Sequence, residues 1–137
     1  MPQRTHLDSG VLLAAWKAWE PLHRHSRNLL DDREREFVSS SLVELETLAQ
    51  AEFHKNLAEE EFYRLYFESV AVKKAPIDES VIALAYDVVR KTQTAGIDAI
   101  HLAAAISSGA DEFVTTEKRT SPLYRETRIL VLNVEDL

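Results

Sequence analysis

Residues 96–105 read Gly-Ile-Asp-Ala-Ile-His-Leu-Ala-Ala-Ala and carry the clearest structural pattern of the chain. The glycine breaks the helical pattern before it. Asp98 then stands in the first turn of a new helix, where the positive end of the helix dipole favours a carboxylate. Leu102 and Ile106 follow at helical spacing and are expected to face a core. The stretch therefore predicts a buried helix that begins with an acid and is capped by Gly109.

Four short apolar segments have the length and composition of buried strands, namely residues 5–7, 37–39, 113–115 and 129–132. Helical patterns begin near residue 11 and end at Pro21, begin again with Ser40 or Ser41 as the cap, and continue over residues 57–69 and from residue 76 onward. This alternation indicates an α/β fold of three layers, α/β/α, around a short, mainly parallel sheet of four or five strands. We expect one domain over residues 1–137.

The composition is that of an ordinary globular protein, with 45% hydrophobic and 28% charged residues. The absence of cysteine rules out disulfides, thiolate metal sites and cysteine nucleophiles, and it fits a reducing compartment. No apolar run approaches the roughly 20 residues that a membrane-spanning helix needs, and residues 1–5 show no signal-peptide core. We therefore expect a cytoplasmic protein that does not enter a membrane.

The net charge of −7 comes from 16 basic and 23 acidic side chains and bears on possible partners. A protein that holds nucleic acid by charge alone is usually basic, because neutralising phosphates supplies nonspecific affinity. The acidic balance therefore argues against a nucleic-acid coat protein. It does not exclude a nuclease, since bound divalent cations invert the local field where a phosphate must lie.

Four acidic residues stand at the ends of expected strands or near the starts of expected helices, namely Asp8, Glu46, Asp98 and Glu117. The carboxyl ends of parallel strands meet at one edge of a sheet, so all four can converge there. Converging carboxylates repel one another, and a hard dication such as Mg²⁺ or Mn²⁺ keeps them ionised. Such a site indicates metal-assisted phosphodiester hydrolysis. Any one of these carboxylates taken alone is more often a helix cap than a ligand.

Four motifs surround these acids in order: His-Leu-Asp-Ser-Gly-Val-Leu-Leu at residues 6–13, Ser-Ser-Leu-Val-Glu-Leu-Glu at 40–46, Asp-Ala-Ile-His-Leu-Ala-Ala-Ala at 98–105 and Phe-Val-Thr-Thr-Glu at 113–117. Together they resemble the PIN-domain family, especially the toxin nucleases of bacterial type II toxin–antitoxin pairs, the VapC-like group. The third motif is the most specific, and the match extends from Asp8 to the closing strand at residues 129–132.

The resemblance implies a Mg²⁺- or Mn²⁺-dependent endoribonuclease that hydrolyses RNA phosphodiester bonds. The catalytic metal ligands that it implies are Asp8 and Asp98, completed by Glu46 and Glu117, and the hydroxyls that would orient these carboxylates belong to Ser9 and Thr115. It also implies a toxin that a cognate antitoxin neutralises, and a homodimer. The rival interpretation is a catalytically silent PIN-like module that binds protein or RNA.

Two positions depart from the family pattern or leave a choice. Glu117 stands where the family usually has Asp, and the extra methylene alters its reach to a metal. Glu44 and Glu46 compete for the second acidic position. We favour Glu46 because its spacing from Ser41 suits the family better.

Three further residues lie near the motifs and bear on the chemistry of the site. Lys118 and Arg119 directly follow Glu117 and are expected at the mouth of the site, where they could bind the RNA backbone. His101 lies three residues after Asp98 on the same expected helix. It is interpreted either as a general base or as a packed, hydrogen-bonded histidine.

The helical segment at residues 57–69 is unusually rich in aromatic side chains. We expect its inner side to carry Leu57, Phe62, Leu65 and Tyr66. One helix cannot bury Phe62, Tyr63, Tyr66 and Phe67 on a single face. The surplus is interpreted either as an exposed groove for an antitoxin segment, by resemblance to the family, or as extra core packing.

Overall fold

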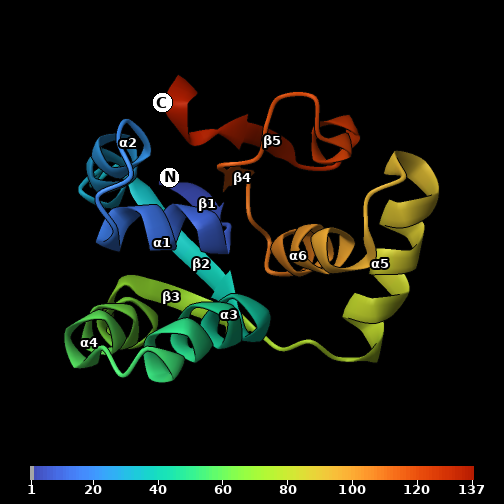
Figure 1. Ribbon diagram of the computed structural model, residues 1–137. Coiled ribbons are helices and arrows are strands. Elements are labelled where there is room, and N and C mark those ends of the chain that lie inside the picture. Colours follow the sequence, from blue (N-terminus) through green and yellow to red (C-terminus); the bar gives the residue numbers. More distant parts are fainter. Residues whose placement is uncertain (1) are drawn as a thin grey trace.

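The computed structural model describes residues 2–137 and has a sheet of five parallel strands (Figure 1). The strands are β1 (Gln3–Leu7), β2 (Arg35–Ser40), β3 (Ala71–Ala75), β4 (Glu112–Thr115) and β5 (Leu130–Asn133). Their order in the sheet is β3-β2-β1-β4-β5, so the direction of winding reverses between β1 and β4. In parallel sheets, ligands bind beyond the carboxyl ends of the strands at such a reversal.

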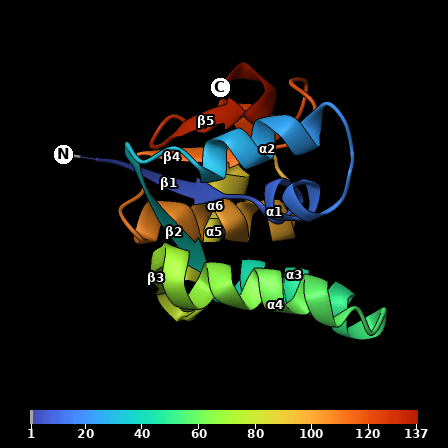
Figure 2. The ribbon, with the colours of Figure 1, turned by 90° about the vertical axis from the view of Figure 1, so that its left-hand side faces the viewer.

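Helices cover both faces of this sheet, which confirms the predicted three-layer fold. They are α1 (Ser9–Trp16), α2 (Leu22–Leu30), α3 (Ser41–Phe53), α4 (Leu57–Leu65), α5 (Glu79–Thr92) and α6 (Gly96–Ser107). Helices α1 to α4 pack with Val114 in one apolar cluster, whereas α5 and α6 pack with Phe113 in another (Figure 2). Phe113 and Val114, which are adjacent in β4, point to opposite faces of the sheet because side chains alternate along a strand. Within residues 2–137, no helix has the length and apolar character needed to cross a membrane.

Helix α3 begins, and helix α6 ends, where the sequence predicts. Ser40, one of the two expected caps, precedes α3, and its Oγ accepts a hydrogen bond from the Val43 N–H at 3.2 Å. Gly109 follows α6 with a φ of 76°, a conformation that favours glycine. These two ends fix where α3 and α6 start and stop beside the sheet.

Strand β3 and helix α2 lie outside the elements predicted from the sequence, and α1 ends at Trp16 rather than at Pro21. Strand β3 reads Ala-Val-Lys-Lys-Ala at the edge of the sheet, and only Ala75 is fully buried. Helix α2 buries only Ser26 and Leu29. Strand β3 buries too little surface to show an alternating pattern. In α2, Leu22 and Leu29 do share one helical face, but the six residues between them are all polar, so the sequence alone gives only a weak signal for this helix.

The predicted inner face of α4 is wrong at two positions. Leu57 and Leu65 are 78% and 51% exposed, and the buried side chains of this helix are Glu59 and Tyr63. The Tyr63 hydroxyl donates a hydrogen bond to the Glu59 carboxylate, which allows a glutamate to occupy the core. The chain continues beyond Leu65 as a wider π-helical turn, which buries Tyr66 and Phe67. Three of the four aromatic side chains are therefore core residues.

Candidate active site

Asp8 lies directly after β1, at the reversal of strand order. Its Oδ1 accepts a hydrogen bond from the Ser9 N–H at 2.8 Å and so caps α1. Its Oδ2 accepts a second hydrogen bond from the Thr115 hydroxyl at 2.8 Å, and its own N–H donates to the Val114 carbonyl at 2.9 Å. Asp8, at the end of β1, is thus held by the start of α1 and by the neighbouring strand β4.

Glu46 projects from α3 toward the same place. Its Oε1 accepts hydrogen bonds from the Ser9 hydroxyl and from His101 Nε2, the latter at 2.7 Å. The hydrogen bond from His101 lowers the pKa of Glu46, with help from Ser9 and against the effect of burial. Glu44 is engaged elsewhere, because Lys74 of β3 donates a hydrogen bond to it at 2.8 Å. Of the two competing glutamates, the structure brings Glu46 into this cluster.

Asp98 and Glu117 complete the group of acids. Burial and the field of Asp8 raise the pKa of Asp98, although His101 opposes this shift. Burial and the fields of Asp98 and Asp8 likewise raise the pKa of Glu117. The four predicted acids are therefore close enough to act on one another through space, although they come from four separate parts of the chain.

The main chain of Glu117 is fixed by three hydrogen bonds that the sequence does not reveal. Its N–H donates to Thr115 Oγ1 at 3.1 Å, and its carbonyl accepts from the Tyr124 hydroxyl at 2.8 Å and from Asn133 Nδ2 at 2.9 Å. Because the Thr115 hydroxyl also donates to Asp8, this single group connects two of the acids. Glu117 lies at the surface, and only part of its side chain is removed from water, which is the desolvation that raises its pKa.

Gly10 allows the loop after β4 to approach the start of α1. A Cβ atom at this position would lie 2.4 Å from the Thr116 hydroxyl oxygen, so a larger residue would require at least the Thr116 side chain to rotate away. The small residue in the first motif therefore brings Glu117, one residue after Thr116, toward Asp8.

The donor set of this cluster fits a hard divalent cation. Residues 2–137 contain no group of three or more His, Asp or Glu side chains already arranged to hold a metal ion. Within the same residues, however, neither Asp98 nor Glu117 forms a hydrogen bond through its carboxylate, so both side chains can turn toward a cation. The converging donors are carboxylate oxygens, which Mg²⁺ and Mn²⁺ prefer.

Lys118 and Arg119 follow Glu117 in an exposed loop, and their environments differ. Arg119 forms an ion pair with Asp136 near the C-terminus, with its Nη2 at 2.6 Å from Oδ1. Lys118 is exposed and has no ion pair among the described residues. Of the two, Lys118 is therefore the cation not already engaged by a carboxylate.

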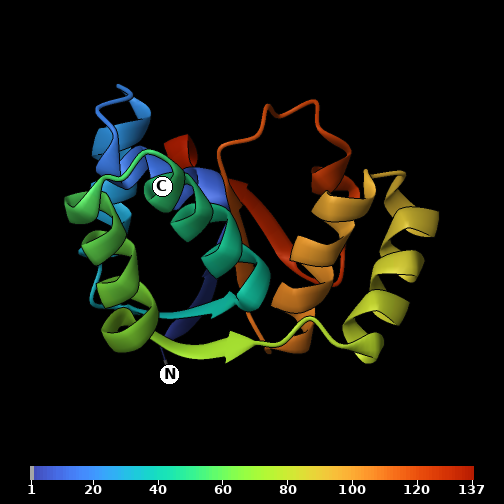
Figure 3. The same ribbon diagram turned by 60° about the horizontal axis from the view of Figure 1, so that its bottom comes forward.

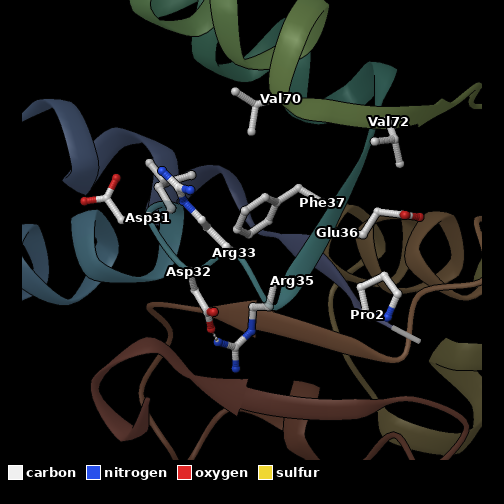
Figure 4. A pocket seen from close by; sticks show the side chains of 10 residues that line it. Pro2, Asp31, Asp32, Arg33, Arg35, Glu36, Phe37, Val70 and Val72 are labelled. Carbon is white, nitrogen blue, oxygen red and sulfur yellow. Dashed lines mark hydrogen bonds and ion pairs between the residues drawn. The ribbon is translucent and has the colours of Figure 1, made fainter.

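A hollow of about 620 Å³ lies at the opposite edge of the sheet, near the amino ends of β2 and β3 (Figure 4). It is lined by charged residues such as Arg33 and Glu36 and by apolar residues such as Val70 and Val72. None of the four candidate acids lines it. This hollow is therefore separate from the acidic cluster.

A family model for the PIN domain matches residues 6–126. The chain belongs to the PIN-domain family. Solved structures similar to this PIN domain include FitAB bound to the IR36 DNA fragment, which is 17% identical with a TM-score of 0.75 over 97% of this chain and 96% of that chain. The match to VapBC2 from Rickettsia felis bound to a promoter DNA fragment is 14% identical, with a TM-score of 0.69 over 96% of this chain and 98% of that one.

The sarcin–ricin-loop-cleaving toxin VapC20 from Mycobacterium tuberculosis is also similar to this PIN domain. It is 14% identical, with a TM-score of 0.63 over 80% of this chain and 86% of that chain. No curated protein sequence matches the chain significantly. The structural neighbours thus confirm a VapC-like PIN fold, and at these identities they show the fold alone.

Proposed function

We propose that this PIN domain is a divalent-metal-dependent endoribonuclease that hydrolyses phosphodiester bonds of RNA. The observation that carries the proposal is the hydrogen-bonded convergence of acids at the reversal of strand order, where no Arg or Lys of the described chain pairs with them. Membership of the PIN family supports a nuclease activity. The structural similarity to VapC20, a toxin that cleaves the sarcin–ricin loop, supports RNA as the substrate class.

In this proposal, Asp8 and Asp98 are the principal ligands of Mg²⁺ or Mn²⁺, and Glu46 and Glu117 complete the site. The bound ion would supply an activated water and would stabilise negative charge on the phosphate. The hydroxyls of Ser9 and Thr115 hold Glu46 and Asp8 in place by the hydrogen bonds described above. No side chain has to act as a nucleophile.

The RNA backbone would lie beside the exposed loop that follows β4. Lys118, which is not engaged in an ion pair within residues 2–137, is the better placed of the two cations for contact with a phosphate. Arg119 would first have to leave Asp136. The phosphates adjacent to the cleaved bond would thereby remain outside the acidic cluster itself.

The same proposal makes this chain a toxin that a cognate antitoxin neutralises, and places it in a homodimer. The structures of VapBC2, of FitAB and of a toxin–antitoxin complex from Klebsiella pneumoniae support the antitoxin partner. A hollow of about 270 Å³ between α2 and α4 could receive an antitoxin segment, and it is lined by Arg27, Leu30, Asp31, Phe62, Leu65, Tyr66 and Val70. The partly buried Phe62 and the exposed Leu65 supply its apolar side.

A cleavage assay tests the proposal. The purified protein is incubated with RNA in the presence of Mn²⁺, in EDTA, and as the variant Asp8→Asn. We expect cleavage to stop in EDTA and to fall at least about 100-fold in the variant, because the loss of a group that only orients a ligand already costs about 10–100-fold. The exposed Asp31, changed to Asn, is the matched control and should cleave normally. Cleavage that ignores both EDTA and Asp8→Asn would reject the mechanism.

A catalytically silent binding module is the second candidate. Glu117 in place of Asp favours it, as does the absence, among residues 2–137, of a preformed group of metal ligands. Calorimetry with Mn²⁺ separates the two functions. A protein that binds no Mn²⁺ at millimolar concentration would support the silent module.

A further inference from the structure

His101 is a buried polar side chain whose role the fold alone does not explain. It lies on α6, three residues after Asp98, and its side chain is 4% exposed. Its neighbours on this helix, residues 102–105, are all apolar and fully buried. A buried imidazole costs free energy unless it is hydrogen-bonded, so an apolar residue would serve packing alone at least as well.

The hydrogen bonds of His101 are limited to one partner. Its Nε2 lies 2.7 Å from Glu46 Oε1, and we assign the proton to this nitrogen because a carboxylate can only accept. Its Nδ1 is buried and has no hydrogen-bond partner among the described residues. Neither nitrogen is therefore available to a water at the acidic cluster, which argues against the interpretation of His101 as a general base.

Glu46 is held through one of its two oxygens only. Both of its donors, Ser9 on α1 and His101 on α6, contact Oε1, whereas Oε2 forms no hydrogen bond or ion pair within residues 2–137. In Figure 3, α3 (teal) and α6 (orange) are separate helices, and the contact between Glu46 and His101 joins them. Two donors from different helices fix the rotation of the carboxylate and leave Oε2 for another ligand.

We propose that His101 is a positioning residue that holds Glu46 so that Oε2 faces a bound divalent cation. The inference rests on the proposed metal-dependent function, and it adds to that function the residue that orients the second acidic ligand. Partners that orient a metal-binding carboxylate typically change metal affinity or activity by about 10–100-fold. His101 thus acts through Glu46 and not on the substrate.

The test measures Mn²⁺ affinity by calorimetry and cleavage in parallel. His101→Leu keeps the volume of the side chain and removes the donor, and we expect a loss of about 10-fold or more in Mn²⁺ affinity. His101→Gln keeps an N–H that can reach Glu46 and should retain most of the affinity. Ser108→Ala is the control, because Ser108 is buried near the end of the same helix and, within residues 2–137, its hydroxyl forms a hydrogen bond only with the Ala105 carbonyl.

A double-mutant cycle shows whether the effect passes through Glu46. In the Glu46→Gln background, His101→Leu should lower Mn²⁺ affinity no further. An equal loss in both backgrounds would overturn the inference, and so would unchanged affinity in His101→Leu. Should His101→Leu not fold, His101→Asn replaces it, because its shorter amide does not reach Glu46 and should lose the affinity that His101→Gln keeps. Equal affinity of the Asn and Gln variants would then contradict the inference.

The outcome for the unsubstituted protein separates this inference from the function on which it rests. No Mn²⁺ binding by that protein would overturn the proposed function and the inference together. Normal Mn²⁺ binding by that protein, combined with normal binding by His101→Leu, would overturn the inference alone.

Discussion

Carboxylates at the two edges of the sheet differ in whether a basic side chain pairs with them. At the amino edge, the buried Glu112 accepts hydrogen bonds at 2.7 Å from both Thr5 Oγ1 and Arg35 Nε. Arg35 also pairs with Asp32, in the turn before β2. At the carboxyl edge, Asp98 and Glu117 have no Arg or Lys partner within residues 2–137, and their pKa values are raised.

Glu126 extends this comparison, because it precedes β5 at the amino edge. Hydrogen bonds from Arg128 lower its pKa to about 2, in spite of burial. At the amino edge, the fold therefore supplies an arginine partner for each of these buried acids. Acids that are left uncompensated beside one another indicate a place where a cation from solution completes the structure.

The largest effect is expected from Asp98→Asn at the carboxyl edge. Cleavage of RNA should fall at least about 100-fold, because a proposed metal ligand is lost. In EDTA, however, the free energy of unfolding should stay the same or rise, because one member of a repelling group becomes neutral. Cleavage rates check the expected loss of activity, and urea denaturation in EDTA checks the expected stability. A variant that loses stability and activity together would mean that Asp98 is a structural residue.

The opposite outcome is expected from Arg35→Met at the amino edge. This change leaves Glu112 buried without its charged partner and should lower the free energy of unfolding by about 3 kcal/mol. Cleavage by the folded fraction should not change. Arg4→Met is the matched control, because Arg4 pairs with Glu36 at a more exposed site, and its loss should cost less than about 1 kcal/mol. If urea denaturation showed the same loss of stability for Arg35→Met and Arg4→Met, the expected difference between the buried and the exposed ion pair would be contradicted.

A smaller, pH-dependent effect is expected from Glu126→Gln. Because the folded pKa of Glu126 lies below the ordinary value of 4.5, its contribution to stability is complete above pH 4.5 and is lost as the pH falls toward about 2. At pH 7 the variant should be less stable by about 2 kcal/mol, which is less than the full linkage value because the partner Arg128 is partly exposed and screened by solvent. Urea denaturation between pH 7 and pH 3 should show the two proteins converging. A constant difference over this range would assign the effect to packing.

The sequence predicts the three-layer fold, which the structure confirms, and it also predicts the edge of the sheet at which the acids should lie. Asp8 directly follows β1, Glu117 lies shortly after β4, and Asp98 stands in the first turn of α6. Because ligands of parallel sheets bind beyond the carboxyl ends of the strands, these positions predict that the acids lie at one edge. The sequence does not clearly reveal edge strand β3, which is mostly exposed, or helix α2, whose leucines are separated by six polar residues. Their positions depend on contacts with the rest of the molecule.

Contacts between distant helices are the part of the site that the sequence does not predict. His101 and Glu46 are 55 positions apart, and their hydrogen bond depends on how α3 and α6 flank the sheet. The same holds for Asn133 and Tyr124, whose hydrogen bonds to the Glu117 carbonyl depend on the position of β5 in the sheet. Helical spacing favours Glu46 over Glu44, whereas the engagement of Glu44 by Lys74 is visible only in the structure.

Anomalous X-ray scattering from crystals soaked in Mn²⁺ would show whether the converging acids bind a common cation. We expect an anomalous peak at the carboxyl edge of the sheet, within ligand distance of carboxylate oxygens of both Asp8 and Asp98. A peak confined to the hollow at the amino edge, or the absence of any peak between Asp8 and Asp98 at millimolar Mn²⁺, would contradict a shared metal site.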